Sequence, residues 1–212
     1  MALELPAVDP ASLAEWCDVH LGSPAERELF RKRHLTCVIG TRLADGREVV
    51  VRVRPAAPRI AVCTEVQLRL FESGYPCPEP LAGPAPLDDY EATAESHLAG
   101  GAVLPDSGRC AQPFATALAQ LVRMAPRPEQ VGSLAPAPAW AAWNHDQGRL
   151  WPRPSDVDVD LNRVGGFDWI DAAGKAARQR LQEGTERAVI GHGDWITDNL
   201  RWDGDRLLVV YD

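Results

Sequence analysis

The residues best suited to chemistry lie at the end of the chain, in the segment HGDWITDNLRWDGDRLLVVYD. It contains the pattern His-x-Asp-x-x-x-x-Asn, formed by His192, Asp194 and Asn199, and then an expected hairpin that ends at Asp212. A carboxylate at Asp194 can accept the proton of a hydroxyl group, and His192 can orient the loop through hydrogen bonds. The Asn199 amide oxygen and the Asp212 carboxylate are oxygen ligands of the kind that Mg²⁺ prefers. Together these residues predict phosphoryl transfer, which also needs a cation on the donor phosphates.

The same segment has two other interpretations. One is an exposed His-Gly-Asp turn followed by an ordinary hairpin, but three residue types at this spacing arise by accident in only about one chain in a hundred. The other is a metal-dependent hydrolase built on His192 and Asp194. This interpretation is weaker because no second cluster of His and Asp residues supplies further ligands.

A small sheet in the first half of the chain is expected to support this chemistry. Residues 35–43 and 48–53 are two β-rich runs joined by Ala-Asp-Gly-Arg, a strong hairpin signal. One face of the second run is expected in the core and consists of Val49, Val51 and Val53. Arg52 and Arg54 share the opposite face, which is expected to look into a cleft or solvent.

Helical spacing and turn residues predict the other elements. Helices are expected over residues 10–21, 59–73, 107–124 and 169–183. A Pro-rich loop is expected over residues 77–89, a strand over 91–98 and another strand through Val189 and Ile190. The stretch from 125 to 166, rich in Pro, Trp and Asp, is expected to be a long irregular insert.

Composition limits the class of protein. A chain of 212 residues with 45% hydrophobic and 25% charged residues predicts a globular protein of one domain or two small lobes. The net charge of −8 argues against a nucleic-acid or membrane partner and is compatible with a cationic small substrate. The start MALELPAVDP has no signal-peptide pattern, and no run approaches the roughly 20 apolar residues of a membrane span. Five scattered cysteines favour a reducing cytoplasm.

The sequence resembles the aminoglycoside phosphotransferase-like family, the small-molecule branch of the protein-kinase-like fold. HGDWITDN is similar to the HGDxxxxN motif of that family, and VVYD resembles its V-x-D motif. The resemblance extends through LADGREVVVRV and TEVQLRLFESGYPCPEPL, from about Pro24 onwards. It implies an α+β, two-lobed fold that uses ATP or GTP with Mg²⁺ to phosphorylate a hydroxyl of an antibiotic, sugar or amino alcohol.

The resemblance also implies roles for single residues. Asp194 corresponds to the catalytic base, with His192 beside it, and Asn199 and Asp212 correspond to the metal ligands. Arg52 falls where the family has a phosphate-clamping lysine. Arginine keeps its charge and can grip a phosphate with two N–H groups, but it is longer and planar.

Other residues are expected around the nucleotide. Glu65, in the helix after Arg52, corresponds to the glutamate that pairs with the clamping cation, although an ordinary solvated position is nearly as good an interpretation. Arg54 is a competing clamp. Glu95 and His97, which precede a glycine pair, are further candidate nucleotide-binding residues.

The expected domain organisation is a small antiparallel-sheet N-lobe over 1–93, a hinge over 94–101 and a partial, mainly helical C-lobe over 102–212. The tip over 31–34 lacks the glycines that let backbone amides approach phosphates. Family members continue with helices beyond the V-x-D motif, so a truncated C-lobe is expected after Asp212. These departures also allow a non-catalytic remnant that binds a nucleotide or a partner without turnover. The oligomeric state is not predicted.

Overall fold

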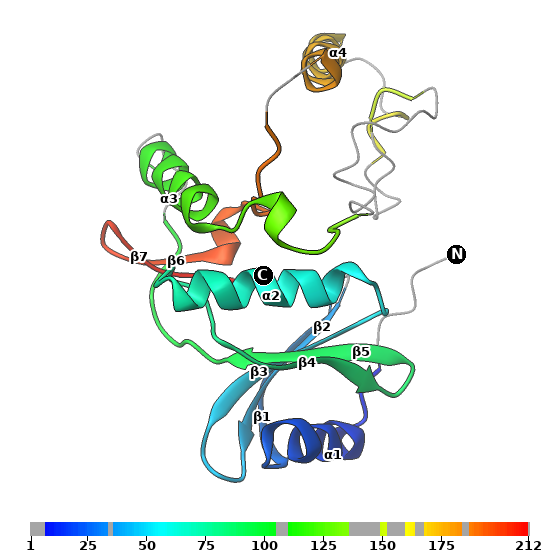
Figure 1. Cartoon of the computed structure of the whole chain (residues 1–212), viewed down its shortest axis with the longest axis vertical. Coiled ribbons are helices and arrows are strands. Elements are labelled where there is room, and N and C mark those ends of the chain that lie inside the picture. The colour runs from blue at the N-terminus through cyan, green and yellow to red at the C-terminus, as the bar shows by residue number, and fades with distance from the viewer. Residues whose placement is uncertain are drawn as a thin grey trace. The chain divides into compact units, whose positions relative to one another are not determined.

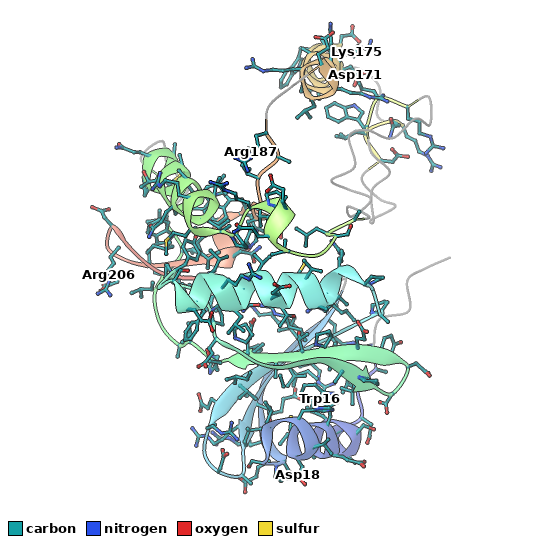
Figure 2. All side chains as sticks on the ribbon, in the orientation of Figure 1. Trp16, Asp18, Asp171, Lys175, Arg187 and Arg206 are labelled. Carbon is teal, nitrogen blue, oxygen red and sulfur yellow. The ribbon has the colours of Figure 1, made fainter. Side chains whose placement is uncertain are left out.

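The computed structural model describes residues 7–33, 36–104, 110–135, 149–151, 160–163, 168–183 and 187–211. The chain divides into two compact units. The first comprises residues 1–133 and 189–212, and the second comprises residues 134–188. Figure 1 shows the elements of each unit and Figure 2 adds their side chains.

The first unit holds most of the regular structure. Its helices are α1 (Pro10–Leu21), α2 (Arg59–Glu72) and α3 (Ala111–Met124), with short 3-10 turns at Pro128–Gln130 and Thr197–Asn199. Its strands are β1 (Ala25–Arg33), β2 (Cys37–Leu43), β3 (Glu48–Arg54), β4 (Pro80–Leu87), β5 (Tyr90–Ser96), β6 (Leu200–Asp203) and β7 (Arg206–Val210). The described part of the second unit contains the helix α4 (Asp168–Glu183).

The strands form two antiparallel sheets. One is five-stranded with the order β1-β2-β3-β5-β4, and the other is the β6-β7 hairpin. The predicted hairpin between β2 and β3 is confirmed, and Gly46 at its turn has a φ of 88°. Such a positive φ favours glycine because it has no Cβ. The α+β fold class with a small antiparallel sheet is therefore confirmed.

One face of the five-stranded sheet packs against α1. Asp9 caps this helix because its carboxylate accepts hydrogen bonds from the backbone N–H groups of Ala11 and Ser12. Figure 2 shows Trp16 pointing from α1 towards the sheet and Asp18 pointing away from it. We call the buried side of this contact the apolar face, made by Leu13, Trp16, Cys17, Cys37, Ile39, Leu43, Val49, Val51, Val53, Ala92 and Ala94. The predicted valine core is thus confirmed.

The other face of the sheet looks towards α2, which lies on the side opposite α1 (Figure 1). Residues of this face alternate with those of the apolar face along β2, β3 and β5, because successive side chains of a strand point to opposite sides. Arg52 and Arg54 are on this second face, as the alternation predicted. It is the face that carries candidate site residues.

Two predicted elements were wrong. Residues 77–89 were expected as a loop, but β4 occupies most of them. Prolines are tolerated there because β4 is an edge strand, where some backbone N–H groups have no partner strand to bind. No strand forms at Val189 and Ile190, which pair with no other strand in the described part of the chain.

The helix predictions fared better. The expected helices over 10–21 and 59–73 correspond to α1 and α2, and α4 spans Asp168–Glu183. The helix expected from Ser107 is described from Ala111 onwards, since residues 105–109 lie outside the described part of the chain. Among the helices of the described residues, none is both long and apolar enough to cross a membrane.

Candidate active site

The loop before β6 is held by His192. Its ring Nε2 donates to the Tyr211 carbonyl at 2.8 Å, and its Nδ1 accepts from the Asp194 backbone N–H at 3.1 Å. The second bond requires an unprotonated Nδ1, so these contacts select the neutral ring with its proton on Nε2. The imidazole is therefore fully engaged with backbone groups, and it fastens the start of the loop to the end of β7.

Asp194 and Asn199 lie next to each other across this loop. The Asn199 side-chain Nδ2 donates to the Asp194 carbonyl at 2.9 Å and to its carboxylate Oδ2 at 3.0 Å. The carboxylate is thus oriented by an amide while the residue stays exposed. Because the amide nitrogen of Asn199 is turned towards Asp194, its oxygen points away and is available to a cation.

Tyr211 precedes Asp212 and is hydrogen-bonded through three separate groups. Its backbone N–H donates to the Asn199 carbonyl at 2.8 Å, and its carbonyl accepts from His192. Its hydroxyl donates to the Leu98 carbonyl at 2.7 Å. Burial raises the pKa of Tyr211, so the hydroxyl stays protonated and can donate. Asp212 itself lies outside the described residues.

Arg52 is paired with Glu95 on the second face of the sheet. Its Nε and Nη2 lie 3.2 Å and 2.9 Å from Oε1 of Glu95, and the two side chains are only 12% and 8% exposed. The other carboxylate oxygen of Glu95 accepts from Gln67 of α2 at 2.9 Å. Gln67 also donates to the Pro78 carbonyl at 3.0 Å. We call Arg52, Glu95 and Gln67 the clamp network.

The partner of Arg52 differs from the expected one. Glu65 was expected to pair with it, but Glu65 pairs with Arg69 one helical turn further on, and both side chains are about two-fifths exposed. Gln67 is two residues after Glu65, and two residues rotate a side chain by about 200° around an α-helix. The side of α2 that faces the sheet therefore presents the Gln67 amide. Among the described residues, the structure gives no hydrogen bond between Glu65 and Arg52.

Another predicted residue, His97, lies near the start of β3. His97 contacts the Glu48 carboxylate at 3.1 Å and lies 5.7 Å, ring to ring, from Phe30. A hydrogen bond from Arg42 is the main cause that lowers the pKa of Glu48. The Phe30 ring lies directly over Gly40, where an added Cβ would come within 2.2 Å of it. His97 is thus tied to an ion-pair cluster and an aromatic ring.

Arg54, the competing clamp, donates to the Thr93 hydroxyl at 2.9 Å. Of the glycine-poor tip, His34 lies outside the described residues, and Lys32, the penultimate residue of β1, lies opposite Val38. Val38 lies opposite Arg52, and directly opposed residues of antiparallel strands share a face, so Lys32 is on the same face as the clamp network.

Sequence reasoning missed three residues of this arrangement. Gln67, Tyr211 and Phe30 were not singled out, because an amide, a phenol and an aromatic ring carry no distinctive spacing. A signal existed for Tyr211, which occupies the variable position of the V-x-D pattern.

The donors fit a hard cation. Within the described residues, no group of three or more His, Cys, Asp or Glu side chains could hold a metal ion. The expected set is Asn199 and Asp212, one of which is described. A site of one amide oxygen and one carboxylate suits Mg²⁺, which keeps several waters and binds substrate phosphates.

The five-stranded sheet, its helix α2 and the loop-and-hairpin site define a kinase-type phosphotransferase. The model of the phosphotransferase enzyme family matches residues 41–212, and the chain belongs to this family. Comparison with the curated proteins found no match.

Several solved structures match this chain, and two illustrate the shared fold. A candidate aminoglycoside phosphotransferase from Ralstonia eutropha JMP134 is 15% identical, with a TM-score of 0.57 over 97% of this chain and 64% of that one. A candidate fructosamine-3-kinase from Thermobifida fusca YX-ER1 is 18% identical, with a TM-score of 0.51 over 95% of this chain and 72% of that one. The present chain thus spans about two thirds of the length of these relatives.

Proposed function

We propose that this chain transfers the terminal phosphoryl group of Mg²⁺-bound ATP or GTP to a hydroxyl group of a small molecule. The observation that carries the proposal is the joint geometry of Asp194 and Asn199. Asn199 orients the Asp194 carboxylate, and both residues belong to a loop that His192 fastens to the strand leading to Asp212. The proposed base and one proposed oxygen ligand, Asn199, thus belong to one hydrogen-bonded unit.

Asp194 is the proposed base. Its exposed carboxylate takes the proton from the acceptor hydroxyl as the hydroxyl oxygen bonds to the terminal phosphorus. The bond from that phosphorus to the bridging oxygen breaks, and the nucleoside diphosphate leaves with the electron pair. Asn199 supports this role because its side-chain N–H donates to the carboxylate and orients it.

Asn199 and Asp212 are the proposed ligands of Mg²⁺. When bound, the cation neutralises charge on the phosphates. Arg52 is the proposed cation on the donor phosphates, because it lies on the sheet face that also carries Lys32. Glu95 holds its guanidinium in one orientation through two N–H groups. We place Glu65 and His97 at the edge of this nucleotide region, as residues that contact other side chains.

The proposed organisation is an N-lobe over 1–93, a hinge over 94–101 and a partial C-lobe over 102–212. Gly100 and Gly101 support the hinge, since both adopt a positive φ. The proposed acceptor is an aminoglycoside-like, amino-alcohol or sugar-like molecule, and a cationic one suits the net charge of −8. Five free thiols suit a reducing cytoplasm.

A second candidate function is a nucleotide-binding module without turnover. The tip over residues 31–34 favours it, because it lacks the glycines that let backbone amides approach phosphates.

Isotope-labelled ATP separates the two candidates. The chain is incubated with Mg²⁺, ATP labelled in its terminal phosphate and a panel of aminoglycosides, amino alcohols and sugars. Label in an organic product supports the phosphotransferase. Nucleotide binding without labelled product supports the module without turnover, and free labelled phosphate alone supports hydrolysis. If the chain neither binds nucleotide nor forms a labelled product, both proposals are rejected.

A further inference from the structure

The structure assigns a role to Tyr211 that rests on the proposed function: it is a positioning residue that ties the catalytic loop to the proposed hinge. Its hydroxyl reaches the Leu98 carbonyl, 113 residues away in the sequence, while its backbone bonds to Asn199 and His192. No other described part of the site joins these segments through one residue. Tyr211 thereby connects three stretches of chain that the proposed reaction needs in register.

The three bonds of Tyr211 differ in what replacement of the side chain removes. The bonds to Asn199 and His192 use backbone groups, so any residue except proline can make them at this position. The bond to Leu98 uses the phenolic oxygen, which only tyrosine supplies at this reach. The link to the hinge is therefore encoded by the side chain alone, and removal of one oxygen atom tests it.

The hinge segment is held to the hairpin at a second place. Ala102 and Trp202 exchange backbone hydrogen bonds of 2.9 Å and 2.8 Å. Gly101 makes this approach possible, because an added Cβ would lie 2.9 Å from the Arg201 Cβ. The Tyr211 hydroxyl holds the segment at Leu98, and the bridge holds the chain at Ala102, directly after it. Held at these two places, residues 98–102 have a defined position on the hairpin.

The consequence concerns the proposed metal ligands. The Asn199 carbonyl accepts a hydrogen bond from the backbone N–H of Tyr211, and Asp212 follows Tyr211 in the chain. A shift of Tyr211 therefore moves both ligands together relative to the hinge and to the nucleotide expected there. Misplacement of binding groups by a small distance is costly for phosphoryl transfer, which depends on positioning.

Tyr75 offers a matched control. Its hydroxyl also donates to a backbone carbonyl, that of Ala117, at 3.4 Å in a buried position. This bond joins the segment after α2 to α3 and touches none of the proposed site residues. Tyr211→Phe and Tyr75→Phe therefore each remove one phenolic oxygen from the same kind of contact, and each should lower the melting temperature by about 2–4 °C.

The experiment measures two quantities on the whole chain. The first is backbone hydrogen exchange at positions 199 and 211 without any ligand. The second is the factor by which Mg²⁺ tightens the binding of ATP, from dissociation constants with and without the metal. We expect Tyr211→Phe to speed the exchange about tenfold and to reduce the Mg²⁺ factor about tenfold. Tyr75→Phe should change each by less than about twofold.

The exchange comparison decides the inference whatever the activity. Faster exchange at positions 199 and 211 in Tyr211→Phe but not in Tyr75→Phe supports the positioning role. Equal exchange in the two variants overturns it, and so does an unchanged Mg²⁺ factor in a variant of a chain that binds ATP. A wild-type chain that binds no ATP refutes the proposed function instead, and the exchange result still decides the link to the hinge.

Discussion

The two faces of the five-stranded sheet differ in what their buried atoms do. The apolar face packs valine and isoleucine side chains of the strands against α1 and its Trp16, and its residues are almost completely removed from solvent. The opposite face buries the clamp network, an ion pair with an amide bound to it. Both faces belong to the same strands and alternate residue by residue along them.

The difference shows which face stabilises the fold and which face places the groups proposed to act in binding. Burial of apolar area stabilises a fold in proportion to the area removed from water. A buried ion pair contributes little net stability, because desolvation of both charges offsets their attraction, yet removal of one partner is costly. The apolar face therefore maintains the sheet, and the clamp network places charged groups where a charged ligand can meet them.

The largest expected effect is on the rate of phosphoryl transfer, and it leaves the stability of the fold unchanged. Asp194→Asn should lower phosphoryl transfer about a thousandfold, because an amide cannot accept the acceptor proton. Its melting temperature and nucleotide affinity should match those of the wild type. Asp198→Asn, an exposed aspartate of the same loop, is the control and should keep its turnover. Turnover retained by Asp194→Asn would remove it as the base.

The next largest effect comes from the apolar face, where a substitution should lower stability and leave nucleotide binding unchanged. Ile39→Ala should lower the free energy of unfolding by about 3 kcal/mol, because it leaves a cavity in a fully buried position. The folded variant should bind nucleotide with unchanged affinity. Leu68→Ala, at a partly exposed position on α2, should cost less than about 1 kcal/mol. Denaturant unfolding measures both values. A change in nucleotide affinity with Ile39→Ala would show that the two faces are coupled.

Glu95→Gln should affect both stability and binding. It replaces the charged acceptor of Arg52 by a neutral amide, and it should lower the free energy of unfolding by about 2 kcal/mol. Nucleotide affinity should fall severalfold because the guanidinium loses its orienting partner. Glu65→Gln, in the exposed pair with Arg69, should change stability by less than about 0.5 kcal/mol. Calorimetric titration of both variants is the measurement. If Glu95→Gln and Glu65→Gln bound nucleotide with equal affinity, the orienting role of Glu95 would be contradicted.

The smallest effect is a dependence of stability on pH, to which one buried thiol on each side of the sheet contributes. Burial raises the pKa of Cys17, on the apolar face, to about 11, and burial with Glu95 nearby raises that of Cys77 to about 12. An unfolded thiol loses its proton near pH 9, so each raised pKa contributes stability that is complete below that pH and is lost as pH rises through the folded value.

From pH 9 to 10 the loss should be about 1 kcal/mol for each thiol. Unfolding curves at the two pH values measure it. Cys17→Ala and Cys77→Ala should each flatten the decline by about half. An identical decline in wild type and both variants would show that other groups cause it.

Local signals predicted much of this fold. Alternating valines in 48–53 predicted the buried face, and the Asp-Gly turn predicted the β2-β3 hairpin. Residues 77–89 were missed because proline content argues against a strand unless its edge position is known. Edge position depends on the order of strands, which no local pattern specifies.

For the site, the sequence by itself determined the motif, the family and the loop that brings Asp194 and Asn199 together, because residues five positions apart in a tight loop are bound to be neighbours. Only the tertiary structure decided that Glu95, and not Glu65, pairs with Arg52, and that Tyr211 reaches Leu98. The residues of the first pair are 43 positions apart in the sequence, and those of the second are 113 positions apart. Helix phase and strand order set such distances, and they are fixed only when the whole chain packs.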